Sequence, residues 1–152
     1  MKKILVSACL CKDPCRYDGK AVSCDDPTFL QWLEEGRFVQ VCPEVLAGLG
    51  VPRGESQRRG DRVVTIEGQD VTEAFFLGAE ATLALAKQEA VAFCILKQRS
   101  PSCGSSIIHE GTFSGIKISG QGVTTEILRN AGFAVVGEDQ MEEAIALEGK
   151  TK

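Results

Sequence analysis

The sequence predicts a single α/β domain with a Rossmann-like fold, in which a mostly parallel sheet carries helices on both faces. Four short apolar runs, at residues 4–8, 38–41, 91–96 and 133–136, are typical of strands buried on both faces. Segments with helical spacing separate these runs, and strands that alternate with helices form parallel sheets with right-handed crossovers. The chain has 152 residues, of which 43% are hydrophobic, so residues 1–152 can bury one core without disulfide staples.

The elements of the first third follow from local signals. A polar loop over residues 12–20 ends the first apolar run. Residues 27–35 carry apolar side chains at helical spacing after Asp26, a suitable N-cap, which predicts a short amphipathic helix. The second strand, residues 38–41, then leads directly to Cys42.

The middle of the chain combines an irregular segment with a long helix. Residues 46–61 are rich in Gly, Arg and Pro, which predicts a loop or lid, and residues 62–66 alternate like a small strand. Residues 71–90 place Ala, Leu and Phe at helical spacing with few breakers, so we expect one long helix packed on the sheet. The third strand, residues 91–96, follows it.

The last third repeats this alternation. Small and turn-forming residues at 100–106 predict a loop at the end of the third strand. Residues 122–130 predict a helix closed by a glycine, residues 133–136 the fourth strand, and residues 141–147 a final helix. Gly-Gln-Gly at the start of the first of these helices lacks the Lys-Ser/Thr end of a phosphate loop, so we expect a turn there.

Charge and hydropathy exclude several classes of partner. The net charge is -4, without the basic footprint that nucleic-acid binding needs, so a small-molecule partner is expected. No run approaches the roughly 18 apolar residues of a membrane span, and the N-terminal run is too short for a signal peptide. We therefore expect a cytoplasmic protein, monomeric or homodimeric, without nucleic-acid or membrane partners.

Three cysteines are expected to meet at one edge of the sheet. The chain has seven cysteines, an odd number, and a disulfide framework is disfavoured for a cytoplasmic domain of this size. Cys9, Cys42 and Cys103 each follow a predicted strand on its carboxyl side. Because ligands of open α/β sheets bind outside the carboxyl ends of the strands, these cysteines predict a functional site there.

The residues alone leave three kinds of site open. Thiolates bind both zinc and iron-sulfur clusters, and a closed structural zinc site would need a fourth ligand, which Cys15 could supply. A cluster held by Cys9, Cys42 and Cys103 alone would keep one iron open as a Lewis acid, which makes the site catalytic. In a third interpretation, Cys103 is a nucleophile that acts without a metal.

Polar residues beside the cysteines could move protons. Glu44 lies two residues past Cys42, and Ser100 and Ser102 precede Cys103, so all three are candidate catalytic residues.

Other notable residues have simpler interpretations. Cys94 lies within a predicted strand as a small apolar residue, and His109, the only histidine, is expected to be structural or exposed. Arg53, Arg58 and Arg59 either recognise an anionic substrate or form a solvated loop face.

Seven motifs together resemble a known family, the thiouracil desulfidases (TudS), formerly a domain of unknown function (number 523). The motifs extend over nearly the whole chain and are Ser7-Ala8-Cys9-Leu10, Cys15-Arg16-Tyr17-Asp18-Gly19, Cys42-Pro43-Glu44, Pro52-Arg53, Gly68-Gln69-Asp70-Val71-Thr72, Ser100-Pro101-Ser102-Cys103-Gly104 and Gly111-Thr112-Phe113. Family members often have Leu-Gly after the first cysteine, whereas this chain has Leu10-Cys11 and therefore an additional thiol.

The resemblance implies an enzyme with a 4Fe-4S cluster bound by Cys9, Cys42 and Cys103. Its open iron would take the sulfur of a thiolated nucleobase such as 2-thiouracil or 4-thiouracil, which is then replaced by oxygen. Glu44 and a serine of the Cys103 loop, Ser100 in preference to Ser102, would handle proton transfer and activation of water. The chemistry of the substrate is consistent with this role of the cluster, because a soft thione sulfur is a natural ligand for cluster iron.

Overall fold

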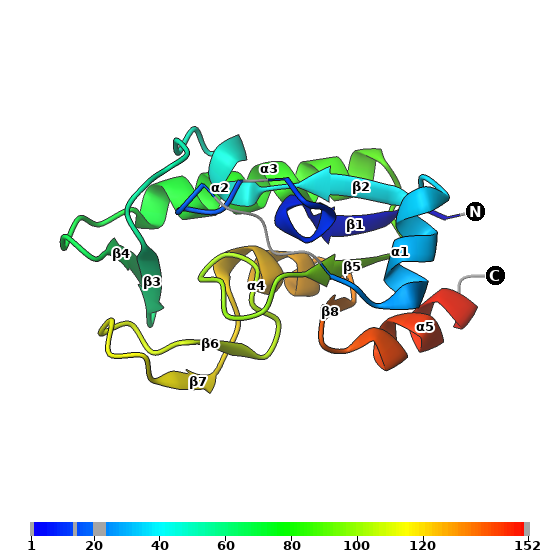
Figure 1. The fold of residues 1–152 in the computed structure, drawn as a ribbon. Helices are drawn as coiled ribbons and strands as arrows, with labels where there is room; N and C mark the ends of the chain where they lie inside the picture. The colour runs from blue at the N-terminus through cyan, green and yellow to red at the C-terminus, as the bar shows by residue number, and fades with distance from the viewer. Residues whose placement is uncertain (1, 14, 20–23, 151–152) are drawn as a thin grey trace.

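A four-stranded parallel sheet forms the centre of the molecule (Figure 1). The computed structural model describes residues 2–13, 15–19 and 24–150. The strands follow the order β2-β1-β5-β8, and all three neighbouring pairs are parallel. Their bounds are β1 (Ile4–Ser7), β2 (Phe38–Val41), β5 (Phe93–Leu96) and β8 (Val135–Gly137). The predicted parallel sheet is confirmed, with small shifts at the strand ends.

Helices cover both faces of the sheet, as predicted. They are α1 (Pro27–Glu34), α3 (Thr72–Gln88), α4 (Val123–Asn130) and α5 (Met141–Lys150). Ile4 and Val6 of β1 belong to the core cluster that includes residues of α1 and α5, whereas Leu5 belongs to the cluster that includes residues of α3 and α4. Successive side chains of a strand point to opposite faces, so all four residues of this strand are buried.

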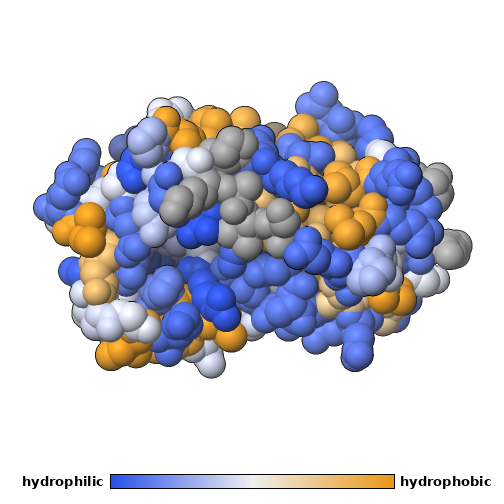
Figure 2. Space-filling model, viewed as in Figure 1, coloured by the Kyte–Doolittle hydropathy of each residue, from blue (hydrophilic) through white to orange (hydrophobic). Residues whose placement is uncertain are grey.

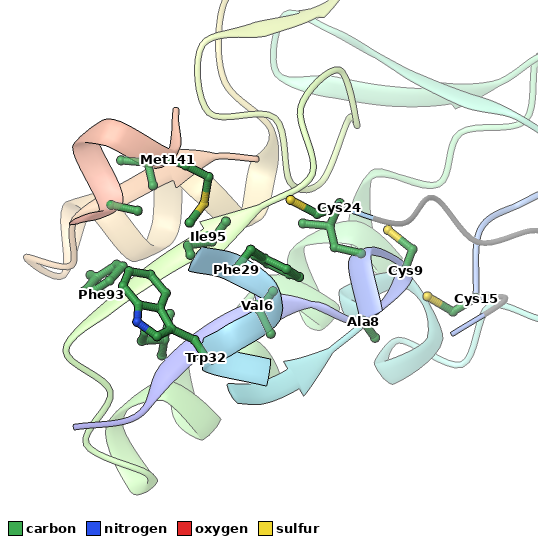
Figure 3. Packing of buried hydrophobic residues seen from close by; sticks show 14 residues of the cluster. Val6, Ala8, Cys9, Cys15, Cys24, Phe29, Trp32, Phe93, Ile95 and Met141 are labelled. Carbon is green, nitrogen blue, oxygen red and sulfur yellow. The ribbon is translucent and has the colours of Figure 1, made fainter. Parts of the chain in front are cut away.

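Aromatic residues and thiols occupy opposite ends of the core on the α1 and α5 side. The Trp32 and Phe93 rings meet edge to face with centroids 6.3 Å apart. Figure 3 shows Cys9 and Cys15 at the other end of this core, away from Trp32 and Phe93. The thiols therefore lie past the carboxyl end of β1.

The start of α1 confirms the predicted cap. The Asp26 carboxylate accepts hydrogen bonds from the amides of Thr28 (2.8 Å) and Phe29 (3.1 Å), and Pro27 occupies the first helical position. These bonds satisfy amide donors that a helix N-terminus leaves without intrahelical partners.

The prediction of a loop over residues 46–61 is partly wrong. Residues of β3 (Ser56–Arg59) pair antiparallel with β4 (Arg62–Thr65). The sequence of β3 is entirely polar, and two of its residues, Gln57 and Arg58, are buried because distant groups bind their side chains. Arg58, for example, donates to the carbonyl of Gln121 (2.8 Å) and to Glu126 (3.0 Å).

Four further elements have no counterpart among the predictions. A second hairpin pairs β6 (Ile107–His109) with β7 (Lys117–Ser119), and two single-turn helices, η1 (Ala8–Cys11) and α2 (Pro43–Leu46), follow β1 and β2. These segments are too short for periodicity to be detected. Both single-turn helices carry site residues.

The surface in the view of Figure 2 is mostly hydrophilic, with apolar residues in small separate groups. Within the described part of the chain, no helix has the length and apolar character to cross a membrane.

Candidate active site

A cavity of about 360 Å³ lies at the carboxyl edge of the sheet and brings the predicted cysteines together. Cys9 comes from η1, Cys42 from the residue before α2, and Cys103 from the loop after β5. Cys15, the possible fourth ligand, also lines the cavity. Residues far apart in the sequence thus meet where the parallel strands end, as the topology requires.

The Cys15 thiol contacts the thiols of both Cys42 and Cys9. The Cys42 thiol donates to the Cys15 carbonyl oxygen at 3.7 Å. A hydrogen bond with the Cys15 thiol, together with burial, raises the pKa of Cys42 far above its ordinary range. The hydrogen bond with Cys42 lowers the pKa of Cys15, but a hydrogen bond with Cys9 and burial outweigh it and raise that pKa to about 11. Without metal the thiols of Cys15 and Cys42 are neutral at physiological pH, so metal binding by either one must displace a proton.

Cys103 is buried beside this group. Burial raises the pKa of its thiol to about 12, although hydrogen bonds with Ser7 and Ser102 act in the opposite direction. A thiol of this kind is a poor free nucleophile at neutral pH, because the thiolate is the reactive form. The metal-free nucleophile interpretation therefore receives no support from its surroundings.

Close packing against α4 sets the position of the Cys103 loop. The amides of Val123 and Thr124, in the first turn of α4, donate to the carbonyls of Pro101 (2.9 Å) and Ser102 (2.8 Å). A Cβ on Gly122 would lie only 2.4 Å from the Ser102 carbonyl oxygen, so a glycine is needed here for close approach. These amides already have partners. The Gly-Gln-Gly segment, predicted as a turn, is instead an irregular link that enters α4 with an extended Gly122.

A second close approach positions Cys42 and Glu44. Gly78 of α3 lies against the short helix α2, where an added Cβ would come within 2.2 Å of the Pro43 carbonyl oxygen. The absence of a side chain on Gly78 lets this helix lie directly on α3. The two glycines therefore place two of the three candidate ligands.

Glu44 lines the cavity as part of an ion pair with Arg53. Its Oε2 atom accepts hydrogen bonds from Arg53 Nε (2.8 Å) and Nη2 (2.5 Å), and both side chains are largely buried. The Arg53 amide is in turn anchored to the Tyr17 carbonyl at 2.7 Å. A charge-assisted pair of this kind holds the carboxylate in a defined orientation.

The two candidate serines have different surroundings. Ser100 lines the cavity, and its Oγ accepts hydrogen bonds from the amides of Ser102 (3.1 Å) and Cys103 (3.0 Å). Ser102 is 1% exposed, and its Oγ lies 2.7 Å from Thr124 Oγ1 rather than along the cavity wall. Of the two serines, the geometry favours Ser100 as the group that reaches a bound molecule.

Arg58, Arg59 and Cys94 lie outside the cavity. Arg58 is 8% exposed and binds Glu126, while Arg59 donates to the Gly111 carbonyl at 2.7 Å. Arg58 is therefore buried and belongs neither to a solvated face nor to an anion site, whereas Arg59 is exposed, as the solvated-face interpretation expects. Cys94 is fully buried in β5, as predicted for a small apolar residue.

Sequence reasoning missed several polar residues of the cavity. Tyr17 donates to Glu55 at 3.2 Å, and Lys97 pairs with Glu138 at 3.3 Å. Lys97 and Arg99 follow β5 directly, the same signal that identified the cysteines, so they could have been predicted. His109, expected to be structural or exposed, also lines the cavity.

The donor set fits a polynuclear cluster better than a single ion. The seven cysteines are free of disulfides. Within residues 2–13, 15–19 and 24–150, no three His, Cys, Asp or Glu side chains surround a point that could hold one metal ion. A closed zinc site needs four ligands within about 2.3 Å of a single ion, whereas an iron-sulfur cluster takes its thiolates on different irons. Several thiols lie along one cavity wall, which matches the ligand arrangement of an iron-sulfur cluster.

Comparisons with known proteins extend over the same residues. A family model described as 2-thiouracil desulfurase matches residues 4–140. The uncharacterized protein YbbK of Bacillus subtilis (strain 168) is 41% identical over 152 residues, which cover 93% of this chain and 99% of that protein. A solved structure described as a 4Fe-4S-dependent thiouracil desulfidase, TudS, matches with a TM-score of 0.94 and 44% identity, covering 97% of this chain and 99% of that one. The matched range includes every residue of the cavity wall.

Proposed function

Because the chain belongs to the 2-thiouracil desulfurase family, we propose that it removes the sulfur of a thiolated pyrimidine, such as 2-thiouracil or 4-thiouracil, and replaces it with oxygen. The observation that carries the proposal is the meeting of three strand-end cysteines and the Glu44–Arg53 pair on one cavity. The cofactor of this reaction is a 4Fe-4S cluster, the group named for the similar solved structure.

Cys9, Cys42 and Cys103 would hold the cluster, with Cys15 as an additional thiol beside them. Cys15 contacts Cys42 and Cys9 through its thiol, so it is placed to replace either one or to stabilise the empty site. When bound by three thiolates, such a cluster supplies a Lewis-acidic iron with affinity for a soft thione sulfur.

Glu44 would move the protons of the exchange. In the net reaction water gives its oxygen to the ring carbon, the carbon-sulfur bond breaks, and both protons of water leave with the sulfur, without oxidation or reduction. A carboxylate on the cavity wall can take a proton from the attacking water and return it to the departing sulfur. Its hydrogen bonds with Arg53 keep it oriented while it does so.

Ser100 would orient a polar atom of the substrate or the attacking water. Its oxygen already accepts two amide hydrogen bonds, which leaves the hydroxyl proton available for donation into the cavity.

Anaerobic reconstitution with iron and sulfide tests the proposal. We expect a brown protein with visible absorption, three cysteines each required for it, and release of sulfide when 4-thiouracil is added. Cys9→Ser, Cys42→Ser and Cys103→Ser should each abolish cluster binding, whereas Glu44→Ala should keep the cluster and lose turnover. A colourless protein that contains zinc and leaves 4-thiouracil unchanged would replace this function with a structural metal site.

A further inference from the structure

One buried side-chain nitrogen of the cavity wall has no hydrogen-bond partner among the described residues. Two other charged groups of the wall have ion-pair partners: Glu44 binds Arg53, and Lys97 binds Glu138. The Nδ1 atom of His109, in contrast, is buried without a hydrogen-bond partner, the only such side-chain atom among the described residues. Its other nitrogen, Nε2, likewise makes no hydrogen bond to any residue in the described ranges.

The backbone around His109 is firmly held, so the missing partner does not reflect a loose segment. His109 pairs with Lys117 in the hairpin of β6 and β7, and the preceding residue, Ile108, bridges to Arg99 at the end of β5. The Gln57 side chain accepts hydrogen bonds from the amides of Gly111 (3.1 Å) and Phe113 (3.1 Å). The hairpin is thus tied to both the sheet and the β3 strand.

The environment of the ring selects one tautomer. A neutral imidazole carries one N–H and one lone pair, and a buried N–H without an acceptor loses the free energy of a hydrogen bond. Because Nδ1 of His109 is buried and has no acceptor, the proton is better placed on Nε2, the nitrogen left for the cavity. His109 therefore presents a donor to whatever the cavity binds.

We propose that His109 is a substrate-binding residue whose Nε2–H donates to the exocyclic oxygen of a singly thiolated pyrimidine. The proposal rests on the proposed function and adds the polar contact that selects the substrate. A thiouracil keeps one carbonyl oxygen after the other has been replaced by sulfur, and that oxygen is a strong acceptor for an N–H donor. The thione sulfur is a weaker acceptor, so this contact distinguishes the two ends of the ring.

Substitutions that keep or remove the donor test the contact by kinetics. His109→Phe should raise the KM of the reconstituted enzyme for 4-thiouracil roughly tenfold, the effect of one lost hydrogen bond, with little change in iron content. His109→Gln, whose amide can donate from a similar position, should restore most of the affinity. Lys117→Met, which changes the strand partner of His109 outside the cavity wall, is the matched control and should keep the wild-type KM.

A binding measurement separates this inference from the proposed function. Because the chain has a single histidine, ¹⁵N-histidine labelling yields one imidazole signal pair, which should report the Nε2–H tautomer and shift when uracil is added to the holoprotein. An Nδ1–H tautomer, an unmoved signal at saturating uracil, or a wild-type KM in both His109→Phe and His109→Gln would overturn the inference. An enzyme that shifts on uracil but releases no sulfide from 4-thiouracil would support the binding role and overturn the proposed function.

Discussion

Replacing Gly122 by alanine should disrupt the cysteine site without changing any candidate ligand. The added Cβ would lie 2.4 Å from the carbonyl carbon and oxygen of Ser102 and 2.8 Å from the amide nitrogen of Cys103. These are backbone atoms, and the Ser102 carbonyl is held by the Thr124 amide at 2.8 Å. No side-chain rotation can relieve the clash, so the loop that carries Cys103 must move away from α4.

The expected cost follows from overpacking. Inserting a methyl group into a filled site costs about 1–3 kcal/mol, and about 2–4 °C of Tm is lost per kcal/mol in a domain of this size. We therefore expect the Tm of the metal-free Gly122→Ala protein to fall by about 2–12 °C. Because Cys103 moves with its loop, iron content after reconstitution should fall as well.

Circular dichroism during heating and an iron assay after reconstitution measure the two effects. Gly149→Ala is the control, since a Cβ there meets nothing within 4 Å and its helix, α5, lies far along the chain from the cysteines. It should leave both quantities unchanged or raise the stability by up to about 1 kcal/mol. Wild-type Tm and wild-type iron content in Gly122→Ala would refute the idea that this close approach positions Cys103.

Three further substitutions test other parts of the structure. Burial raises the pKa of Cys94 from its ordinary value of 9.0 to about 12, so the stability from its neutral thiol is present below about pH 9 and lost as the pH rises towards 12. Cys94→Val should therefore move the alkaline unfolding midpoint of the metal-free protein to higher pH. An unchanged midpoint would contradict this. Arg53→Met should lower kcat at least about tenfold while iron content is retained, because Glu44 loses the partner that orients it. Unchanged turnover would show that the Glu44–Arg53 pair has no role in the mechanism. Gln98→Leu should lower the free energy of unfolding in urea by at least about 2 kcal/mol, since the Gln98 side-chain oxygen accepts hydrogen bonds from three consecutive amides of the following loop. A smaller loss would mean that other groups or water replace these hydrogen bonds.

The central sheet was predictable because its signals are local. The two central strands, β1 and β5, are short apolar runs buried on both faces, as the centre of a parallel sheet requires. Strand β2 was predicted from the same kind of run, but it lies at the edge of the sheet and is only partly buried, so its predicted burial on both faces is wrong. Asp26 and Pro27 marked the start of α1 for a similar reason, since a cap and its amides are neighbours in the chain. The edge on which Cys9, Cys42 and Cys103 meet then followed from strand direction alone.

The two hairpins were not predictable in this way. Strand β3 consists of polar residues whose partners, such as Glu126 and Gln121, lie more than 60 positions away in the sequence. Burial of Arg58 is stable only when those partners are present, so the local pattern contains no sign of it. The same holds for His109, which was expected to be structural or exposed and which the fold places on the cavity wall.

By itself, the sequence determined the fold class, the strand-end position of the three cysteines and, through its motifs, the family. Periodicity, caps and strand direction are properties of neighbouring residues, and the cysteines inherit their position from them. Only the tertiary structure decided which polar groups serve the cavity: it paired Glu44 with Arg53, turned Ser102 towards Thr124 and left His109 without a partner. Hydrogen bonds and ion pairs of buried groups depend on distances across the fold, which spacing along the chain does not contain.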